Sequence, residues 1–293
     1  MKTLSGKVAV VTGASRGVGK GIALALGDQG ATVYVTGRTV RDGDYELSGS
    51  VGETAAEVTR RGGAGVPVRV DHADDVQVAA LFDQVRSEHS RLDILVNNAF
   101  TLPEDLTDQK PFWDKPISDW EMVDVGVRSN FVAARHAAQI MVPQNSGLIV
   151  ATSGYVGVTY TYGVVFGLCK VAVDRMARDM AIELLPHNVA SISLWQGLTM
   201  TERAQRNLAA DPEMADSIVT SPAVGCSPEY PGRVIAALAT DPDLIKLSGG
   251  TFITAELATR YGVTDIDGRT IPSLRAERGS PIWRPVMEAG RGR

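Results

Sequence analysis

The chain has 293 residues, of which 29 are basic and 34 are acidic, giving a net charge of −5. This acidic balance provides no overall positive field, so neither nucleic acid nor an anionic membrane is expected as a partner. Apolar residues make up 44% and charged residues 22%, as in an ordinary globular protein, and two cysteines are too few for a disulfide scaffold. With no apolar run near 18 residues and no leader pattern at the N-terminus, we expect a cytoplasmic protein.

Short Val-rich runs alternate with longer stretches of helical periodicity. The predicted strands are Lys7–Thr12, Thr32–Thr36, Val66–Val70, Ile94–Asn97, Leu148–Ser153 and Val189–Leu194, and the predicted helices are Gly19–Asp28, Gly52–Arg61, Val76–His89, Ile117–Met141 and Val164–Leu185. Strands that are apolar on both faces and alternate with helices predict an α/β fold with a parallel sheet covered on both sides. We expect one domain over residues 1–275 and a C-terminal tail, 276–293, that is extended or partly disordered.

The first strand leads directly into TGASRGVG, residues 12–19, and then into an amphipathic helix. Glycines in such a loop permit a tight turn and close approach of the backbone to a pyrophosphate, and the helix N-terminus offers free amides to the phosphates. The placement between a strand and a helix predicts a dinucleotide-binding loop. Its candidate cofactor-binding residues are Gly13, Ser15, Arg16, Gly17, Val18 and Gly19.

The end of the second strand distinguishes between the two nicotinamide cofactors. An NAD-binding strand ends with an acid that holds the ribose hydroxyls, whereas this strand ends in Gly37 followed by Arg38. Arg38 and Arg16 can each pair with a phosphate through charge-assisted hydrogen bonds. The sequence therefore favours NADP(H).

Taken in order, several motifs resemble the short-chain dehydrogenase/reductase family. They are TGASRGVG, Asp71, NNA at 97–99, Asn130, Ser153, Lys170 and a Gly-containing turn near residue 197. FWDKP, MVPQNSGLIV and LATRYGVTDIDGR are similar to one branch of that family, dehydrogenase/reductase member 1. The resemblance implies a Rossmann-type, doubly wound, seven-stranded parallel sheet in a three-layer α/β/α arrangement. It also implies assembly as a homodimer or homotetramer.

The resemblance further implies roles for single residues. Asp71, with His72 beside it, would hold the adenine amine, and Asn98 and Ala99 would line the ribose. Lys170 would clamp the ribose of the nicotinamide, and Gly197, Thr199 and Thr201 would cover the nicotinamide and the diphosphate. Gln196 stands where the family usually has proline, so the shape of this turn departs from the family pattern.

The family's catalytic residues are present at all positions but one. In the family a serine holds the carbonyl oxygen, an asparagine supports a water relay, and a lysine lowers the pKa of a tyrosine acid four residues before it. Ser153, Asn130 and Lys170 match three of these positions. The fourth position is Phe166, whose ring has no hydroxyl and can neither donate nor accept a proton.

Phe166 leaves four hypotheses open. An engineered Tyr-to-Phe change in an otherwise intact reductase is the first, and a natural reductase with a relocated acid, Tyr155, Tyr160 or Tyr162, is the second. The third is a family member with non-redox chemistry such as cyclisation or dehydration, and the fourth is an NADP(H)-binding protein without turnover. The two reductase hypotheses together are favoured, because Ser153, Asn130 and Lys170 are retained.

The expected substrate is a carbonyl or alcohol on a moderately large apolar molecule. We expect its pocket at the carboxyl ends of the strands. The proposed lining is apolar and aromatic: Phe100, Phe112, Trp113, Tyr155, Tyr160, Trp195, Leu198 and Met200. The four histidines show no metal-ligand spacing, and Cys169 is expected to pack in the core, so neither a metal site nor a cysteine nucleophile is predicted.

Overall fold

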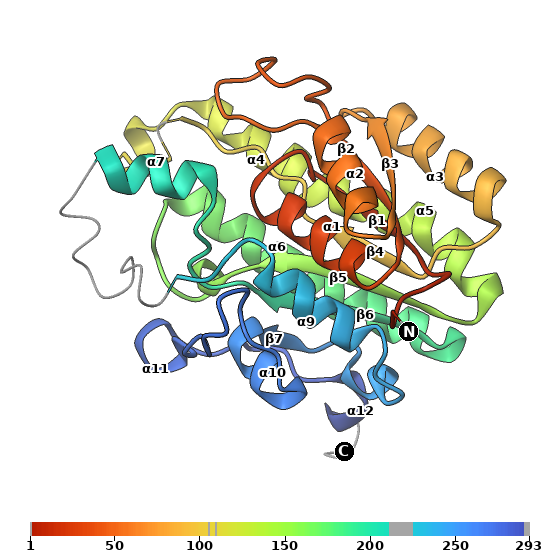
Figure 1. The fold of residues 1–293 in the computed structure, drawn as a ribbon. Helices are drawn as coiled ribbons and strands as arrows, with labels where there is room; N and C mark the ends of the chain where they lie inside the picture. The colour runs from red at the N-terminus through yellow and green to blue at the C-terminus, as the bar shows by residue number, and fades with distance from the viewer. Residues whose placement is uncertain (1, 105, 109, 211–224, 290–293) are drawn as a thin grey trace. The chain divides into compact units, whose positions relative to one another are not determined.

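The computed structural model describes residues 2–104, 106–108, 110–210 and 225–289 (Figure 1). Seven strands form a parallel sheet in the order β3-β2-β1-β4-β5-β6-β7. Their bounds are β1 Val8–Val11, β2 Thr32–Gly37, β3 Ala64–Arg69, β4 Ile94–Asn97, β5 Gly147–Ser153, β6 Val189–Trp195 and β7 Thr251–Ile253. This order confirms the predicted doubly wound, Rossmann-type sheet with flanking helices.

The chain divides into two compact units that are described separately below. Unit one comprises Met1–Val70, Gln196–Pro242 and Ile253–Ser273. Unit two comprises Asp71–Trp195, Asp243–Phe252 and Leu274–Arg293. The motifs that the sequence singles out fall in both units, with the phosphate loop in unit one and the catalytic set in unit two.

Unit one is built on β1, β2 and β3, which pair in parallel from Val8 opposite Thr32 and from Thr32 opposite Ala64. Its helices are α1 Gly17–Asp28, α2 Val51–Arg60, α7 Glu202–Ala210, α9 Tyr230–Leu238 and α10 Thr254–Tyr261. Helices α1 and α9 pack closely because their contact positions are glycines. A Cβ added at Gly232 would lie 2.6 Å from the Cα of Ile22.

Unit two is built on β4, β5 and β6, which are also parallel neighbours. Its longer helices are α3 Asp75–His89, α5 Ser129–Gln144 and α6 Val164–Leu184, and α6 packs against β5 and β6 (Figure 1). The strands are buried along their whole length apart from Gly147, at the start of β5, which is partly buried. The six predicted strands therefore match β1 to β6 in position, with β3 beginning two residues earlier than expected. The expected burial on both faces was wrong for β3, which lies at the edge of the sheet and is exposed or partly buried along its length.

The predicted helix over 117–141 is more irregular than its periodicity indicates. The segment contains a 3-10 turn at Ile117–Trp120, a short α4 at Glu121–Val123, a π-helical turn at Asp124–Arg128 and then α5. Gly126 lies within the π turn, where a Cβ would come within 2.2 Å of the Phe100 ring. The ring therefore packs directly on the helix backbone, which is a tertiary contact that periodicity does not reveal.

The C-terminal segment of unit two is held by backbone hydrogen bonds. It includes α11 Arg275–Arg278 and α12 Val286–Ala289. The Thr251 amide donates to the Trp283 carbonyl at 2.9 Å, and the Val286 amide donates to the Ser248 carbonyl at 2.8 Å. Residues 290–293 of the predicted tail lie outside the described residues.

Candidate functional site

The phosphate loop of unit one connects β1 to α1, as the sequence predicts. Gly13 and Gly17 have φ values of 64° and 56°, in the left-handed region that glycine adopts without strain. The Ala14 amide is used inside the unit, donating to the Thr36 carbonyl at 2.8 Å. The Gly17 amide, at the first residue of α1, faces an anionic group instead.

That group is the carboxylate of Glu202, whose oxygen accepts a hydrogen bond from the Gly17 amide at 3.0 Å. Glu202 begins α7, immediately after Thr201. The contact shows that the start of α1 accommodates an anion, as the positive end of a helix dipole does. The loop therefore fits a nucleotide phosphate. Sequence reasoning missed Glu202, whose only signal was an acid next to the turn expected to cover the cofactor.

The two arginines expected at the 2′-phosphate differ in their surroundings. The Arg16 guanidinium donates to the carbonyls of Ser48 and Gly49, at 3.1 and 2.8 Å, and lies 4.8 Å from the centre of the Tyr45 ring. Its partial burial lowers its pKa. Arg38 is exposed and has no hydrogen-bond or ion-pair partner among the described residues. Arg16 thus holds the loop over residues 42–50, while Arg38 is available to a ligand.

The turn expected to cover the cofactor is anchored by backbone pairing. The Met200 amide donates to the Cys226 carbonyl and the Cys226 amide to the Leu198 carbonyl, both at 2.9 Å. Gly197 has a φ of 77°, and Thr199 is buried. The Thr201 hydroxyl accepts from the Ala204 amide at 3.2 Å, so this threonine caps the start of α7.

The adenine and ribose residues of the prediction lie in unit two. Asp71 is partly exposed, follows Val70 and accepts a hydrogen bond from the Ala73 amide at 3.0 Å, whereas His72 is buried. Asn98 and Ala99 follow β4 directly. Their role toward a cofactor stays a prediction.

Among the predicted catalytic residues, Ser153 ends β5, and Phe166 and Lys170 lie in the first two turns of α6, within unit two. The Lys170 Nζ donates to the Thr152 carbonyl at 3.3 Å and lies 4.3 Å from the centre of the Phe100 ring and 5.6 Å from that of Phe166. Desolvation by these surroundings lowers the pKa of Lys170 to about 8. A lysine with such a pKa exchanges protons near neutrality.

Ser153 and Asn130 are both buried. The Ser153 hydroxyl donates to the Lys170 carbonyl at 3.3 Å. The Asn130 side chain donates to the Gly126 carbonyl at 3.0 Å, and its own carbonyl accepts from the Asn97 side chain at 3.0 Å. The π turn before α5 thereby fixes Asn130 beside the carboxyl end of β4.

Phe166 is packed as a core side chain. Its ring makes edge-to-face contacts with Phe100 and Tyr162, with ring centres 5.4 and 5.5 Å apart. It belongs to a buried cluster with Met122 and Cys169. Burial raises the pKa of the Cys169 thiol to about 11, which keeps it protonated at neutral pH, as a packing residue would be.

The tyrosines considered as relocated acids lie in different environments. The Tyr155 hydroxyl accepts a hydrogen bond from the Leu274 amide at 3.1 Å, so this tyrosine is tied to the C-terminal segment. Tyr162 is partly exposed and contacts Phe166 edge to face, and Tyr160 is exposed. Of the three, Tyr162 is the one in contact with the Phe166 ring.

Asp174 is a second residue that the sequence reading missed. It lies on α6 one turn after Lys170 and is 5% exposed. Its carboxylate accepts from the Ser193 hydroxyl at 2.5 Å and from the Trp195 indole at 2.9 Å. Trp195 is therefore a core side chain with no exposure, and its prediction as a pocket wall was wrong. Its spacing in sequence gave no indication that β6 turns this indole toward α6.

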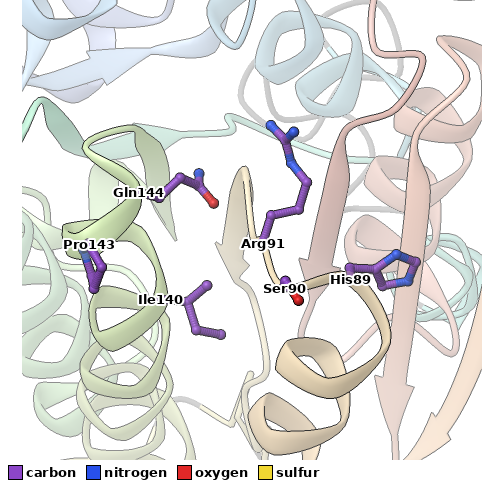
Figure 2. A pocket seen from close by; sticks show the side chains of 6 residues that line it. All are labelled: His89, Ser90, Arg91, Ile140, Pro143 and Gln144. Carbon is purple, nitrogen blue, oxygen red and sulfur yellow. The ribbon is translucent and has the colours of Figure 1, made fainter.

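A cavity of about 490 Å³ also opens in unit two, far along the strands from these residues. Figure 2 shows its lining: the end of α3 with the turn before β4 on one side, and the end of α5 on the other. These are the amino ends of β4 and β5, whereas ligands of parallel sheets bind at the carboxyl ends. Arg91 is already paired with Asp93 at 2.6 Å, and Gln144 bonds the backbone of Leu92. This cavity is therefore not the predicted substrate pocket.

Other classes of site find no support in the described part of the chain. Among these residues, no group of three or more His, Cys, Asp or Glu side chains is arranged to hold a metal ion. No described helix has the length and apolar character needed to cross a membrane.

The sheet order and the phosphate loop define a dinucleotide-binding α/β protein, and comparison with known proteins gives its family. The family model "short chain dehydrogenase" matches residues 7–212. Dehydrogenase/reductase SDR family member 1 from Mus musculus is 41% identical over 276 residues, covering 92% of this chain and 86% of the relative, and the Homo sapiens protein is 39% identical over the same length. A short-chain type dehydrogenase/reductase from Mycobacterium marinum, known from a crystal structure, is 28% identical with a TM-score of 0.72, covering 85% of this chain and 94% of that one. The chain belongs to the short-chain dehydrogenase/reductase family of oxidoreductases.

Proposed function

We propose that this protein is an NADP(H)-dependent oxidoreductase that interconverts a carbonyl and an alcohol on a moderately large apolar substrate. The observation that carries the proposal is the placement of Ser153, at the end of β5, beside Lys170 of α6: the Lys170 backbone carbonyl accepts the Ser153 hydroxyl at 3.3 Å, and burial lowers the pKa of the lysine to about 8. Burying the lysine ammonium destabilises the folded protein, and packing alone would not require a lysine at this position. Its presence therefore supports a functional role.

The choice of NADP(H) over NAD(H) is supported by Arg38. Its guanidinium is exposed and has no partner among the described residues. It lies directly after β2, where an NAD-binding protein has an acid that binds the ribose hydroxyls. The bound cofactor would supply or accept the hydride. Within the protein, the Gly17 amide would bind a phosphate, and Lys170 would hold a ribose hydroxyl.

Phe166 at the family's tyrosine position requires another source for the proton. Within the oxidoreductase proposal, that source is a relocated acid, and Tyr162 is the tyrosine in contact with Phe166. A second candidate function is an NADP(H)-binding protein without redox turnover, or with non-redox chemistry. The tight aromatic packing of Phe166 favours that candidate, because the ring has a structural role that needs no hydroxyl.

The two candidates are separated by measuring NADPH oxidation over a panel of ketones and aldehydes, for this chain and for Phe166→Tyr. We expect turnover in the unmodified chain and a higher rate in the variant, by up to about 10²–10⁴-fold, the usual contribution of a positioned general acid. Binding of NADPH without oxidation in either chain would exclude the oxidoreductase proposal.

We also propose that the protein is cytoplasmic and assembles as a homodimer or homotetramer. Helix α6 carries exposed apolar side chains at helical spacing, Val164, Leu168 and Val171, and α5 carries the exposed Phe131. A second copy of the chain would cover such a face. The net charge of −5 gives no support to nucleic acid or membranes as partners.

A further inference from the structure

The Lys170 ammonium of unit two lies over aromatic rings rather than beside an acid. Its Nζ is 4.3 Å from the centre of the Phe100 ring and 5.6 Å from the centre of the Phe166 ring. The Thr152 carbonyl accepts its hydrogen bond at 3.3 Å, and no carboxylate of the described residues forms an ion pair with it. The face of an aromatic ring carries partial negative charge and attracts an ammonium. One backbone oxygen and the ring faces therefore hold this charge.

The fold brings Phe100 to this lysine from a different strand. Phe100 follows the end of β4 by three residues, and Thr152 lies near the end of β5. The two strands are parallel neighbours, so both ends lie at the same edge of the sheet. The π turn fixes the ring from another side, because Gly126 has no Cβ, and one built there would come within 2.2 Å of the ring. Three separate elements thus place one ring over one ammonium.

We propose that Phe100 is a positioning residue of this site, and that its π face, with Phe166 as a second wall, holds the Lys170 ammonium at the end of β5. The inference deepens the proposed function and rests on it in one respect, namely that Lys170 binds a ribose hydroxyl of the cofactor. An ammonium has three N–H donors, and one is donated to the Thr152 carbonyl. The rings attract the charge without accepting a conventional hydrogen bond, so a donor remains for the ribose. Phe166 has a function here that needs no hydroxyl.

The Phe100 ring acts on the pKa of Lys170 in two opposite ways. Its bulk excludes water, which favours the neutral amine and contributes to the lowering of the pKa to about 8. Its π face favours the ammonium and raises the pKa. The titratable neighbours on the same helix, Cys169 and Asp174, both raise it as well. From β5 and from the segment after β4 the lysine meets a carbonyl and a ring, neither of which titrates.

Two substitutions of Phe100 separate the π face from the bulk of the ring. Phe100→Leu keeps an apolar side chain of similar size but removes the face, so we expect the pKa of Lys170 to fall by about 0.5–1 pH unit. Phe100→Ala also admits water, so we expect the pKa to rise instead, toward the ordinary value of a lysine. A ring that only fills space predicts no change for Phe100→Leu.

The measurement is an NMR titration of the cofactor-free full chain with its lysines labelled with ¹³C at Cε. Lys170→Arg identifies the Lys170 signal by its loss. Phe252→Leu, at a partly buried ring on β7, is the matched control and should leave the titration of Lys170 unchanged. A midpoint that stays the same or rises in Phe100→Leu would overturn the proposal.

The unmodified chain gives a second readout that does not depend on the folding of any variant at Phe100. Protons that lie over an aromatic ring resonate upfield, so the Cε protons of Lys170, next to Nζ, should appear upfield of those of exposed lysines such as Lys246. Cε protons of Lys170 at the ordinary position would contradict the proposal.

Nucleotide binding connects the inference to the proposed function. The ribose that Lys170 would hold is common to NADPH and NADH, so Phe100→Leu should weaken the binding of both by a similar factor, about 3–10-fold. If the unmodified chain binds neither nucleotide, the proposed function is wrong, and the NMR titration still decides the role of the ring. If NADPH binds and Phe100→Leu changes neither its affinity nor the Lys170 titration, the proposed function stands and the role of Phe100 is wrong.

Discussion

At the scale of single residues, the arginines near the phosphate loop differ in function although both were expected at a phosphate. The Arg16 guanidinium donates hydrogen bonds to the carbonyls of Ser48 and Gly49, so it holds the loop over residues 42–50 in place. Arg38 has no such partner among the described residues. The charge that distinguishes NADP(H) from NAD(H) is therefore expected to come mainly from Arg38.

Replacing Arg38 by alanine should weaken NADPH binding by about 10–100-fold, the equivalent of a charge-assisted hydrogen bond, and leave NADH binding nearly unchanged. Titration calorimetry with both nucleotides measures this directly. Arg41→Ala, a change three residues away at an exposed side chain, is the matched control. Equal losses for NADPH and NADH would show that Arg38 does not contact the 2′-phosphate.

A second residue-level prediction concerns Gly126, whose Cα faces the Phe100 ring. Gly126→Ala would place a Cβ 2.2 Å from that ring, and relief requires the Phe100 ring to shift. Alanine favours a helix by about 1 kcal/mol over glycine, but overpacking costs about 1–3 kcal/mol, so we expect net destabilisation. Thermal unfolding would show a lower Tm. In a Phe100→Ala background, where the ring is gone, the same change should no longer destabilise.

At the scale of elements, α7 and α1 are joined in unit one through the Glu202 carboxylate and the Gly17 amide. A nucleotide phosphate needs the same amide and carries the same sign of charge. The helix N-terminus therefore favours Glu202 only while no phosphate is bound. Cofactor binding must move the start of α7 or at least its first side chain.

Glu202→Gln should consequently tighten NADPH binding by about 2–5-fold, the equivalent of 0.3–1 kcal/mol for a charge at a helix N-terminus. The control is Glu46→Gln, which removes an exposed acid paired with Arg206 on the same α7 helix. Dissociation constants from nucleotide fluorescence would suffice. Weaker binding in Glu202→Gln would mean that this side chain helps to hold the cofactor.

At the scale of the whole molecule, the fold was largely predictable from sequence. Each of β1 to β6 is a short Val-, Ile- or Leu-rich run next to a helix with regular periodicity, so strand, loop and helix follow from local pattern. The π turn at Asp124–Arg128 was not predictable, because it depends on the Phe100 ring that packs on Gly126 from 26 residues away.

The candidate site was predictable only where its residues follow a motif. Gly17, Ser153 and Lys170 stand at fixed offsets from a strand or from one another, so spacing alone identifies them. Asp174 and Glu202 are defined by contacts instead: with the Trp195 indole 21 residues away, and with an amide 185 residues away. Side-chain contacts between distant segments follow from packing, which no local pattern encodes.

The proposed assembly of the molecule depends on the exposed apolar side chains of α5 and α6, which we expect to form the interface between subunits. Phe131 is 53% exposed on α5, and Leu168 is 45% exposed on α6, where Val164 and Val171 are exposed at helical spacing from it. Burial of one such side chain in a dimer contributes about 1.5–3 kcal/mol, whereas a buried, unpaired glutamate there would be strongly unfavourable. Phe131→Glu with Leu168→Glu should therefore convert a dimer or tetramer into monomers, as measured by size-exclusion chromatography with light scattering. Ile117→Glu, at a side chain that is 92% exposed on the separate 3-10 turn, should leave the assembly intact. A monomeric unmodified chain, or variants that remain assembled, would mean that these two helix faces are not the interface.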